Sequence, residues 1–269
     1  MSRQNYYARK RRRKKRAVKE DVILSLVREE RRLQPRLGGR KLLVRIRPRL
    51  EAAGAEVGRD RFFAFLRDHD LLVKPKPKKP KTTQSRHSLP VYGNRAVETE
   101  TSGPHQVWVA DITYVRTEEG FVYASVIMDR HTRVIVGAHM GDTLETAGCL
   151  AALEKALKTL PKGASPLHHS DRGCQYCSHA YVERLHEKGL SVSMTEVFHC
   201  YENAHAERVI GTLKQEYELD AIFRTKADAE KAFYQAVYLY NHCRPHRSLG
   251  YRTPMEVHQA GGGGKKAAA

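Results

Sequence analysis

The stretch VWVADITYV, residues 107–115, decides the fold of the longer part of this chain. It is made of β-branched and aromatic residues, which favour a strand, and a single carboxylate, Asp111, interrupts it. Residues 118–120 (EEG) supply a turn, and residues 121–128 form a second run of the same kind, which predicts a hairpin. A third strand is expected over residues 134–140. The sequence therefore predicts three consecutive antiparallel strands.

Helical and strand patterns alternate after these three strands. An Ala- and Leu-rich helix is expected from Thr143, as its cap, to about Leu160. A short buried strand over residues 167–170 ends at Asp171. The pattern then predicts, in order, a helix over about 179–188, a strand over 190–194, and helices over about 202–219 and 226–241. This alternation indicates an α/β fold with a mixed sheet.

Residues 1–73 follow a different pattern, which predicts a small all-α domain. Helical periodicity runs over residues 17–33, about 40–53 and about 59–71, and Pro48 is expected to kink or shorten the second helix. Short helices with arginines on the last one are typical of a helix-turn-helix-like DNA-binding domain. A helical bundle with a solvated basic face would show the same pattern.

The excess positive charge of the chain is confined to its first third. The net charge is +18, and residues 1–81 hold 27 Lys and Arg against 9 Asp and Glu, whereas the remainder holds 21 of each. Such a field attracts polyanions, nucleic acid first and an anionic membrane second. We therefore expect this basic arm to contact double-stranded DNA. The candidate contacts are Arg11, Arg12, Arg13, Lys14, Lys15, Arg16, Arg59, Arg61, Lys76, Lys78 and Lys79.

A Lys/Pro tract, KPKPKKPK over residues 74–81, predicts an extended linker that continues through a polar stretch. The predicted organisation is a basic helical region over 1–73, this linker over 74–104, an α/β core with C-terminal helices over 105–258, and a disordered tail over 259–269.

Composition excludes several classes of protein. No apolar run approaches the ~18 residues that a membrane span needs, and the N-terminus lacks the apolar region of a secretory signal. Hydrophobic residues make up 41% of the chain, which is enough for a core. Five cysteines in a chain without such a signal do not indicate a disulfide framework, so a reducing cytoplasm is expected.

Three carboxylates stand where a metal-dependent site would need them. Cutting or joining a phosphodiester can use two divalent ions about 3.5–4 Å apart, and Mg²⁺ is held by a few carboxylates together with phosphate oxygens. Asp111 interrupts an apolar strand, Asp171 ends the next central strand, and Glu207 lies on a helix. Their spacing is weak evidence by itself, because a strand-end Asp can cap a turn and a helical Glu can pair with a basic neighbour.

Four ordered motifs around these carboxylates carry a resemblance to a known family. The motifs are Trp108-x-x-Asp111-Ile-Thr-Tyr114, His169-Ser-Asp171-Arg-Gly-x-Gln-Tyr176, Glu202-Asn203-Ala-x-Ala-Glu207-Arg-x-x-Gly211-Thr-Leu-Lys214 and Tyr240-Asn241-x-x-Arg244-Pro-His246-x-Ser-Leu-Gly250-Tyr-x-Thr-Pro254. They resemble those of the aspartate-aspartate-glutamate transposases and retroviral-type integrases. More narrowly, nearly the whole chain resembles the second-reading-frame (OrfB) transposase of bacterial insertion sequences, including the 35 residues between the last two carboxylates.

The resemblance implies a ribonuclease-H-like mixed five-stranded sheet flanked by helices, preceded by the small helix-turn-helix-like domain. It implies that Asp111, Asp171 and Glu207 bind two Mg²⁺ ions, with Mn²⁺ as a substitute. The implied reaction is hydrolysis that exposes a 3′-hydroxyl at a transposon end, followed by attack of that hydroxyl on another phosphodiester. The implied partners are double-stranded DNA, a second copy of the chain, and a helix-turn-helix protein or fusion from an upstream frame, in the cytoplasm near the bacterial nucleoid.

Five further residues are candidates for orienting the carboxylates or contacting DNA. They are His169, Asn203, Lys214, Arg244 and His246. The asparagine and the lysine share roughly one helical face with Glu207, although local capping and a solvated lysine would explain them equally well. The arginine and the second histidine lie in a basic, aromatic loop that either holds DNA or locks the preceding helix to the core.

Other interpretations of the same residues stay open. Cys174 and Cys177 with nearby histidines have zinc-like spacing, but a structural zinc site usually has a second ligand pair elsewhere, so we expect packing and no zinc. A DNA-binding regulator with an inactive core would bind DNA without Mg²⁺-dependent joining. A ribonuclease-H-like or junction nuclease would cleave DNA without forming strand-transfer products.

Overall fold

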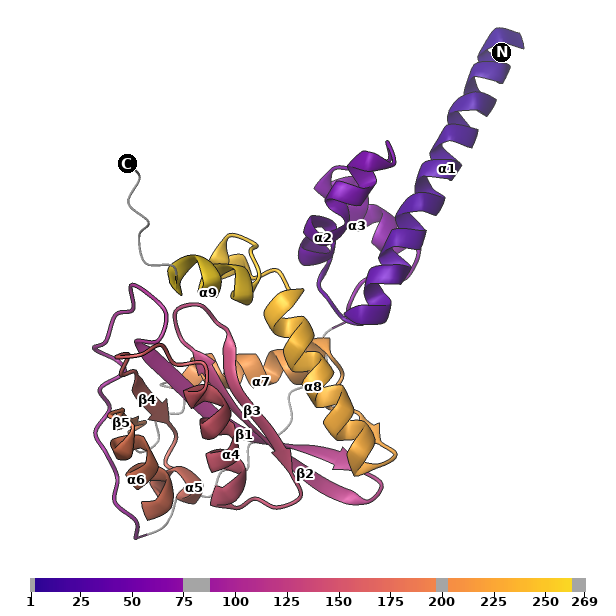
Figure 1. Ribbon diagram of the computed structural model, residues 1–269. Helices are drawn as coiled ribbons and strands as arrows, with labels where there is room; N and C mark the ends of the chain where they lie inside the picture. The colour runs from indigo at the N-terminus through magenta and orange to yellow at the C-terminus, as the bar shows by residue number, and fades with distance from the viewer. Residues whose placement is uncertain (1–2, 75–87, 197–202, 263–269) are drawn as a thin grey trace, which may run out of the picture. The chain divides into compact units, whose positions relative to one another are not determined.

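The chain is described by a computed structural model over residues 3–74, 88–196 and 203–262 (Figure 1). Within these ranges the chain forms two compact units, one on each side of residues 75–87. Each unit has hydrophobic clusters of its own. The two units therefore have separate cores.

The first unit consists of three helices packed on a shared apolar core. They are α1 (Arg3–Leu33), α2 (Gly39–Ala52) and α3 (Arg59–Asp68). The core contains side chains from all three, among them Val27, Leu42, Ile46, Phe62 and Leu66. A buried carboxylate, Glu30, adds a polar link, because it accepts hydrogen bonds from Gln34 at 2.8 Å and from Arg45 of α2 at 3.1 Å.

Two helices of this unit differ from the prediction. The first helix begins at Arg3 instead of near residue 17, because the basic run contains no proline or glycine that would end a helix. The second helix continues through Pro48 to Ala52 and is not shortened. Pro48 is exposed and lies in the last turns of α2, so the proline removes one hydrogen bond without forcing its ring into the core.

The second unit is built on a mixed sheet in the order β3-β2-β1-β4-β5, which confirms the predicted architecture. The strands are β1 (Val107–Thr117), β2 (Gly120–Asp129), β3 (Ile135–Gly141), β4 (Leu167–Ser170) and β5 (Ser191–Met194). The first three pair antiparallel, and β4 and β5 pair parallel to β1 and β4. A two-residue strand, β6 (Ile222–Phe223), adds to the far end of β1 and was not predicted.

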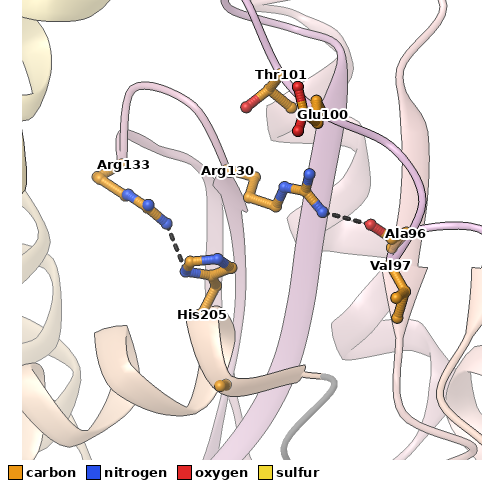
Figure 2. A pocket seen from close by; sticks show the side chains of 8 residues that line it. Ala96, Val97, Glu100, Thr101, Arg130, Arg133 and His205 are labelled. Atoms are coloured by element: carbon orange, nitrogen blue, oxygen red, sulfur yellow. Dashed lines mark hydrogen bonds between the residues drawn. The ribbon is translucent and has the colours of Figure 1, made fainter.

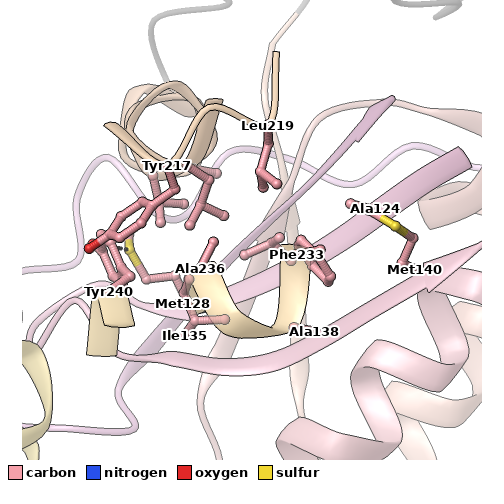
Figure 3. Packing of buried hydrophobic residues seen from close by; sticks show 14 of the residues in the cluster. Ala124, Met128, Ile135, Ala138, Met140, Tyr217, Leu219, Phe233, Ala236 and Tyr240 are labelled. Atoms are coloured by element: carbon pink, nitrogen blue, oxygen red, sulfur yellow. Dashed lines mark hydrogen bonds between the residues drawn. The ribbon is translucent and has the colours of Figure 1, made fainter. Parts of the chain in front are cut away.

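Helices cover both faces of this sheet (Figure 1). One apolar cluster joins the sheet to α4 (Thr146–Leu157), α5 (Cys174–Cys177) and α6 (His179–Glu187), and the other joins it to α7 (Ala204–Glu216) and α8 (Lys226–His242). Side chains of β1 alternate between the clusters: Trp108 and Ala110 belong to the first, whereas Val107 and Val109 belong to the second. Figure 3 shows the second cluster, where Phe233 and Tyr240 of α8 pack on the sheet. A 3₁₀ turn (Arg247–Leu249) and α9 (Pro254–Gly262) follow.

Helix ends differ from the predictions by a few residues. The helix after β3 begins at Thr146 with Glu145 at its N-cap position, so Thr143 is not the cap. Helix α7 is shorter than the predicted span of 202–219, and its predicted first residue, Glu202, lies outside the described residues. No helix within the described ranges is long and apolar enough to cross a membrane.

Part of the predicted linker packs on the second unit. Residues 89–101, here called the strap, are irregular in backbone, yet Ala96 is buried in the core and Leu89 and Tyr92 pack against it. The backbone N–H groups of Arg95 and Ala96 donate to Ser193 Oγ of β5 at 2.9 and 3.3 Å. Residues 75–87 of the predicted linker lie outside the described residues, whereas the strap is attached to the sheet.

Buried polar contacts lock α7 and α8 together and to the sheet. Arg244, after α8, donates two hydrogen bonds to Glu216 at the end of α7, at 2.8 and 2.9 Å, and only 6% of Arg244 is exposed. Asn241 of α8 bonds both backbone groups of Ile135 at the start of β3. These contacts fix the two helices that cover one sheet face.

The first prediction concerns the close approach of β3 to α4. A Cβ at Gly137 would collide with the carbonyl oxygen of Ala152 and lie 2.9 Å from Ala156 Cβ. We expect Gly137→Ala to lower the free energy of unfolding by about 1–3 kcal/mol, measured by urea denaturation. Gly211→Ala is the control, because its Cβ meets open space on a helix and should stabilise by about 0.5–1 kcal/mol. Equal effects of the two substitutions would contradict this packing.

The second prediction concerns the Arg244–Glu216 pair. Arg244→Met should lower the free energy of unfolding by about 3–5 kcal/mol, because it leaves a half-buried carboxylate without its bidentate partner. Combining it with Glu216→Leu should cost much less than the sum of the two single substitutions. Arg184→Met breaks a more exposed pair with Glu154 and should cost under about 1 kcal/mol. Additive effects at Arg244 and Glu216 would show that the pair does not hold the helices.

Candidate active site

Parallel pairing of β1 and β4 brings the first two carboxylates to one edge of the sheet. Val109 of β1 is registered with His169 of β4. Asp111 stands two residues beyond Val109, and Asp171 stands two residues beyond His169, directly after the end of β4. Because neighbouring parallel strands advance together, the two aspartates reach the same level of the sheet. The 59 residues that separate them in sequence form the rest of the hairpin, β3 and α4.

Each aspartate is oriented by a nearby backbone amide. The N–H of Ile112 donates to Asp111 Oδ1 at 2.8 Å, and the N–H of Gly173 donates to Asp171 Oδ1 at 3.0 Å. A Cβ on Gly173 would lie only 3.0 Å from Asp171 Oδ1, which explains a glycine two residues after the aspartate. Both carboxylates are half-buried. Their oxygens are therefore held in fixed directions at the rim of the core.

The third carboxylate comes from the first turn of α7. Asn203, which precedes this helix, is buried and donates from Nδ2 to the carbonyl oxygen of Ala110 at 3.0 Å. This bond anchors the start of α7 to the residue of β1 just before Asp111. Glu207 follows one helical turn later and is half-buried, while Ala206 and its apolar neighbours on α7 face the sheet. Asn203 therefore contacts the backbone of β1 rather than a carboxylate directly.

Electrostatics show that the carboxylates of different elements affect one another. Burial raises the pKa of Asp171, the Gly173 N–H opposes that rise, and the negative charge of Glu207 adds to it. The buried Tyr176 hydroxyl has a pKa raised well above its usual value, first by burial and also by the charges of Asp111 and Asp171 among others. The carboxylates of β1, the end of β4 and α7 therefore lie close enough for their charges to act on Asp171 or on the neighbouring Tyr176.

The donor set fits a hard divalent cation, although it does not form a closed cage. Across the described ranges, no group of three His, Cys, Asp or Glu side chains is arranged so that it could hold a metal ion by itself. Mg²⁺ usually takes one or two carboxylates, several waters and substrate phosphates, so a closed protein cage is not required. The mutual repulsion of Asp171 and Glu207 is what a bound cation would relieve.

His169 links the strap to the aspartate that follows it. The histidine is fully buried, and its Nδ1 lies 2.9 Å from Ser193 Oγ. Ser193 Oγ also accepts the two strap amides, so this hydroxyl joins His169 to the strap. His169 thereby connects the strap, β5 and the end of β4, two residues from Asp171.

Three other candidates lie farther along the chain, Lys214 on α7 and Arg244 and His246 after α8. Lys214 extends its ammonium group over the ring of Tyr114 at 4.5 Å, so it links α7 to β1 two turns beyond Glu207. Arg244 binds Glu216, which stands about 13 Å beyond Glu207 along the helix axis. His246 Nε2 lies 3.1 Å from the hydroxyl of Tyr240. The contacts of Arg244 and His246 are those of residues that lock α8, and neither is brought to the carboxylates.

The Cys and His residues near Asp171 make packing contacts. The thiol of Cys177 donates to the sulfur of Met194 at 3.6 Å, and burial raises its pKa to about 11. His168 Nε2 lies 3.0 Å from the Tyr181 hydroxyl, and burial lowers the pKa of His168 to about 3. A neutral thiol and a neutral, buried imidazole stabilise the interior between β4, β5 and α6.

Few side chains of the predicted basic arm are described. Arg59 and Arg61 lie at the start of α3, both exposed, and Arg59 forms an ion pair with the adjacent Asp60 at 2.7 Å. Arg61 keeps an exposed side chain on the same helix. The remaining predicted contacts lie outside the described side chains: Arg11, Arg12, Arg13, Lys14, Lys15, Arg16, Lys76, Lys78 and Lys79.

Comparison with known proteins agrees with this arrangement. Two family models, both described as integrase core domains, match residues 101–200 and 188–254. A 31 kDa protein of insertion element IS600 from Shigella sonnei is 38% identical over 212 residues, which cover 78% of each chain. Transposase InsF of insertion sequence IS3A from Escherichia coli is 31% identical over 214 residues, 79% of this chain and 74% of the relative.

A solved structure shows the same fold. A chain of the simian T-cell lymphotropic virus intasome superposes with a TM-score of 0.52 at 15% identity, over 86% of this chain and 74% of that chain. This structural similarity shows the fold, whereas the family models and the two insertion-sequence relatives show the family. The chain therefore belongs to the insertion-sequence transposases that contain an integrase core domain.

Proposed function

We propose that this transposase cleaves DNA at insertion-sequence ends and joins the freed ends to other DNA, with Asp111, Asp171 and Glu207 as its metal-binding carboxylates. The observation that carries the assignment of these residues is the pairing of β1 with β4, which sets two aspartates side by side, together with the effect of Glu207 on the pKa of Asp171. The same three residues occupy the motifs that resemble the family's catalytic triad.

Two Mg²⁺ ions, or Mn²⁺ in their place, would supply activation of the attacking oxygen and stabilisation of the leaving oxygen. The chain's own contribution is positional. Asn203 anchors the start of α7 to Ala110, so that Glu207 projects toward the aspartates, and the amides of Ile112 and Gly173 hold one oxygen of each aspartate. No side chain has to form a covalent bond to DNA, because a water molecule and then a 3′-hydroxyl serve as nucleophiles.

The division of charge supports separate roles for the two units. The basic first third would bind DNA through the exposed Arg59 and Arg61 of α3 and the run of residues 9–16, while the neutral core carries out the chemistry. Pairing two ends would require at least two copies of the chain in the DNA complex. A helix-turn-helix segment from an upstream frame would be a further partner, and the bacterial nucleoid the site of action.

Removing one carboxylate should abolish joining. Asp111→Asn and Glu207→Gln should each lower the rate of strand transfer about a hundredfold or more, since each removes a metal ligand without changing side-chain size. The assay uses labelled terminal-repeat DNA and Mg²⁺, with products resolved on a gel. Glu183→Gln, an exposed glutamate on α6, is the matched control and should keep wild-type rates. Undiminished joining by the Asp111 and Glu207 variants would refute the proposed triad.

Deleting residues 1–81 should weaken DNA binding and its dependence on salt. Each lost phosphate contact lowers the slope of log Kd against log salt by about 0.9, so the loss of several contacts should flatten the slope by several units. Fluorescence anisotropy across a series of KCl concentrations measures both quantities. The shortened chain keeps the apolar clusters of the second unit, and its melting curve serves as the folding control. An unchanged slope would assign DNA binding to the core instead.

A further inference from the structure

A pocket of about 750 Å³ opens beside the start of α7 (Figure 2). The strap forms one wall, the turn between β2 and β3 forms another, and the first residues of α7 form the third. Its polar lining consists of Glu100 and Thr101 from the strap, Arg130 and Arg133 from the turn, and His205 from α7. All three walls belong to the second unit.

The two arginines of the pocket are held in place by neutral acceptors. Arg130 donates to the carbonyl oxygen of Ala96 at 2.6 Å and to that of Thr99. Arg133 donates from Nη1 to His205 Nδ1 at 2.6 Å, as Figure 2 shows. Among the described residues, neither arginine forms an ion pair with a carboxylate. Two positive charges are thus fixed beside one cavity without a direct ion-pair partner, although Glu100 lines the same cavity and the charge of Asp129 acts on Arg133.

Both guanidinium groups lie at partly buried positions, and burial lowers the pKa of each. For Arg133, Tyr240 and Asp129 oppose this shift, whereas the charges of Arg130 and Arg208 add to it. His205 Nδ1 accepts the hydrogen bond from Arg133, so the imidazole carries its own hydrogen on Nε2. Each guanidinium has five N–H groups, and most of them remain available to an anion. Glu100 is exposed at the strap and is paired with neither arginine.

The pocket lies near two of the three elements that carry the carboxylates, β1 and α7. Arg130 follows Asp129, which is registered with Trp108, three residues or about 10 Å before Asp111 on β1. His205 stands two residues before Glu207 on α7. A DNA strand that reaches the carboxylates can therefore place a neighbouring part of its backbone over the arginines.

We propose that this pocket binds a backbone phosphate of the DNA that is being cut or joined, with Arg130 and Arg133 as its ligands. The inference rests on the proposed function, because it takes the ligand to be the transposase's own DNA substrate. A phosphodiester offers two acceptor oxygens that match the planar donors of a guanidinium. In this proposal the strap orients Arg130, because the carbonyl oxygens of Ala96 and Thr99 accept hydrogen bonds from its guanidinium group.

The test measures DNA affinity of the full chain, not catalysis. Arg133→Asn removes one charge and suits the left-handed backbone at this position, where φ is 66°. Arg130→Gln removes the other. Each variant should bind a terminal-repeat duplex about three- to tenfold more weakly, and its salt slope should fall by about 1. Arg116→Gln is the control, because this exposed arginine pairs with Phe121 at the opposite end of the hairpin and should leave both values unchanged.

A second arm identifies the bound phosphate. Phosphates of the duplex are replaced one at a time by uncharged methylphosphonates, and one position should weaken the wild type but cause no further loss in Arg133→Asn. Melting curves of the variants show that they fold. Unchanged affinity and slope in both folded variants, or an equal loss in Arg116→Gln, would overturn the proposal. Because binding is measured without joining, a chain that binds DNA but never joins it would refute the proposed function and leave this test intact.

Discussion

Holding like charges together is the constraint on which this structure depends. Asp171 is half-buried and lies within the field of Glu207, so its charged form is disfavoured in the folded protein. Such an arrangement persists only where the surrounding fold fixes the residues independently of their own interactions. The parallel pairing of Val109 with His169 fixes the two aspartates, and the bond from Asn203 to Ala110 fixes the start of the glutamate's helix.

The rest of the second unit holds that geometry in place. Apolar side chains of α7 and α8 pack against one face of the sheet. The buried pair of Arg244 and Glu216 ties the end of α7 to the end of α8. On the other side, the strap is bonded through Ser193 to His169 and through Arg130 to the β2–β3 turn. A segment that follows the basic arm is therefore connected to the residues around the carboxylates.

Features that depend on neighbouring residues, such as the strands and the hairpin, were predictable from the sequence. The apolar strands, their hairpin and the position of Asp111 inside a strand follow from periodicity, and the motifs are the source of the three proposed carboxylates. Contacts between distant segments were not predictable in the same way. The sequence left open whether Arg244 contacts DNA or locks its helix to the core, because its acceptor, Glu216, is 28 residues away. The polar strap was predicted to be a linker because its anchor, Ser193, is 97 residues beyond Ala96. The presence of two arginines, Arg130 and Arg133, in one short turn is the sequence feature from which the pocket could have been predicted.

The central claim is that Asp111, Asp171 and Glu207 form one cation site, and a melting experiment on wild type and Asp171→Asn tests it most directly. Because the folded pKa of Asp171 lies above its unfolded value, its charge destabilises the fold at neutral pH, and that cost disappears as the pH falls below this range. Without divalent ions, Asp171→Asn should melt at a higher temperature than the wild type. Mg²⁺ should then stabilise the wild type, by about 2.7 kcal/mol at a hundredfold excess over Kd, and leave the variant unchanged. A variant that melts lower without Mg²⁺ and gains as much from it as the wild type would contradict the claim.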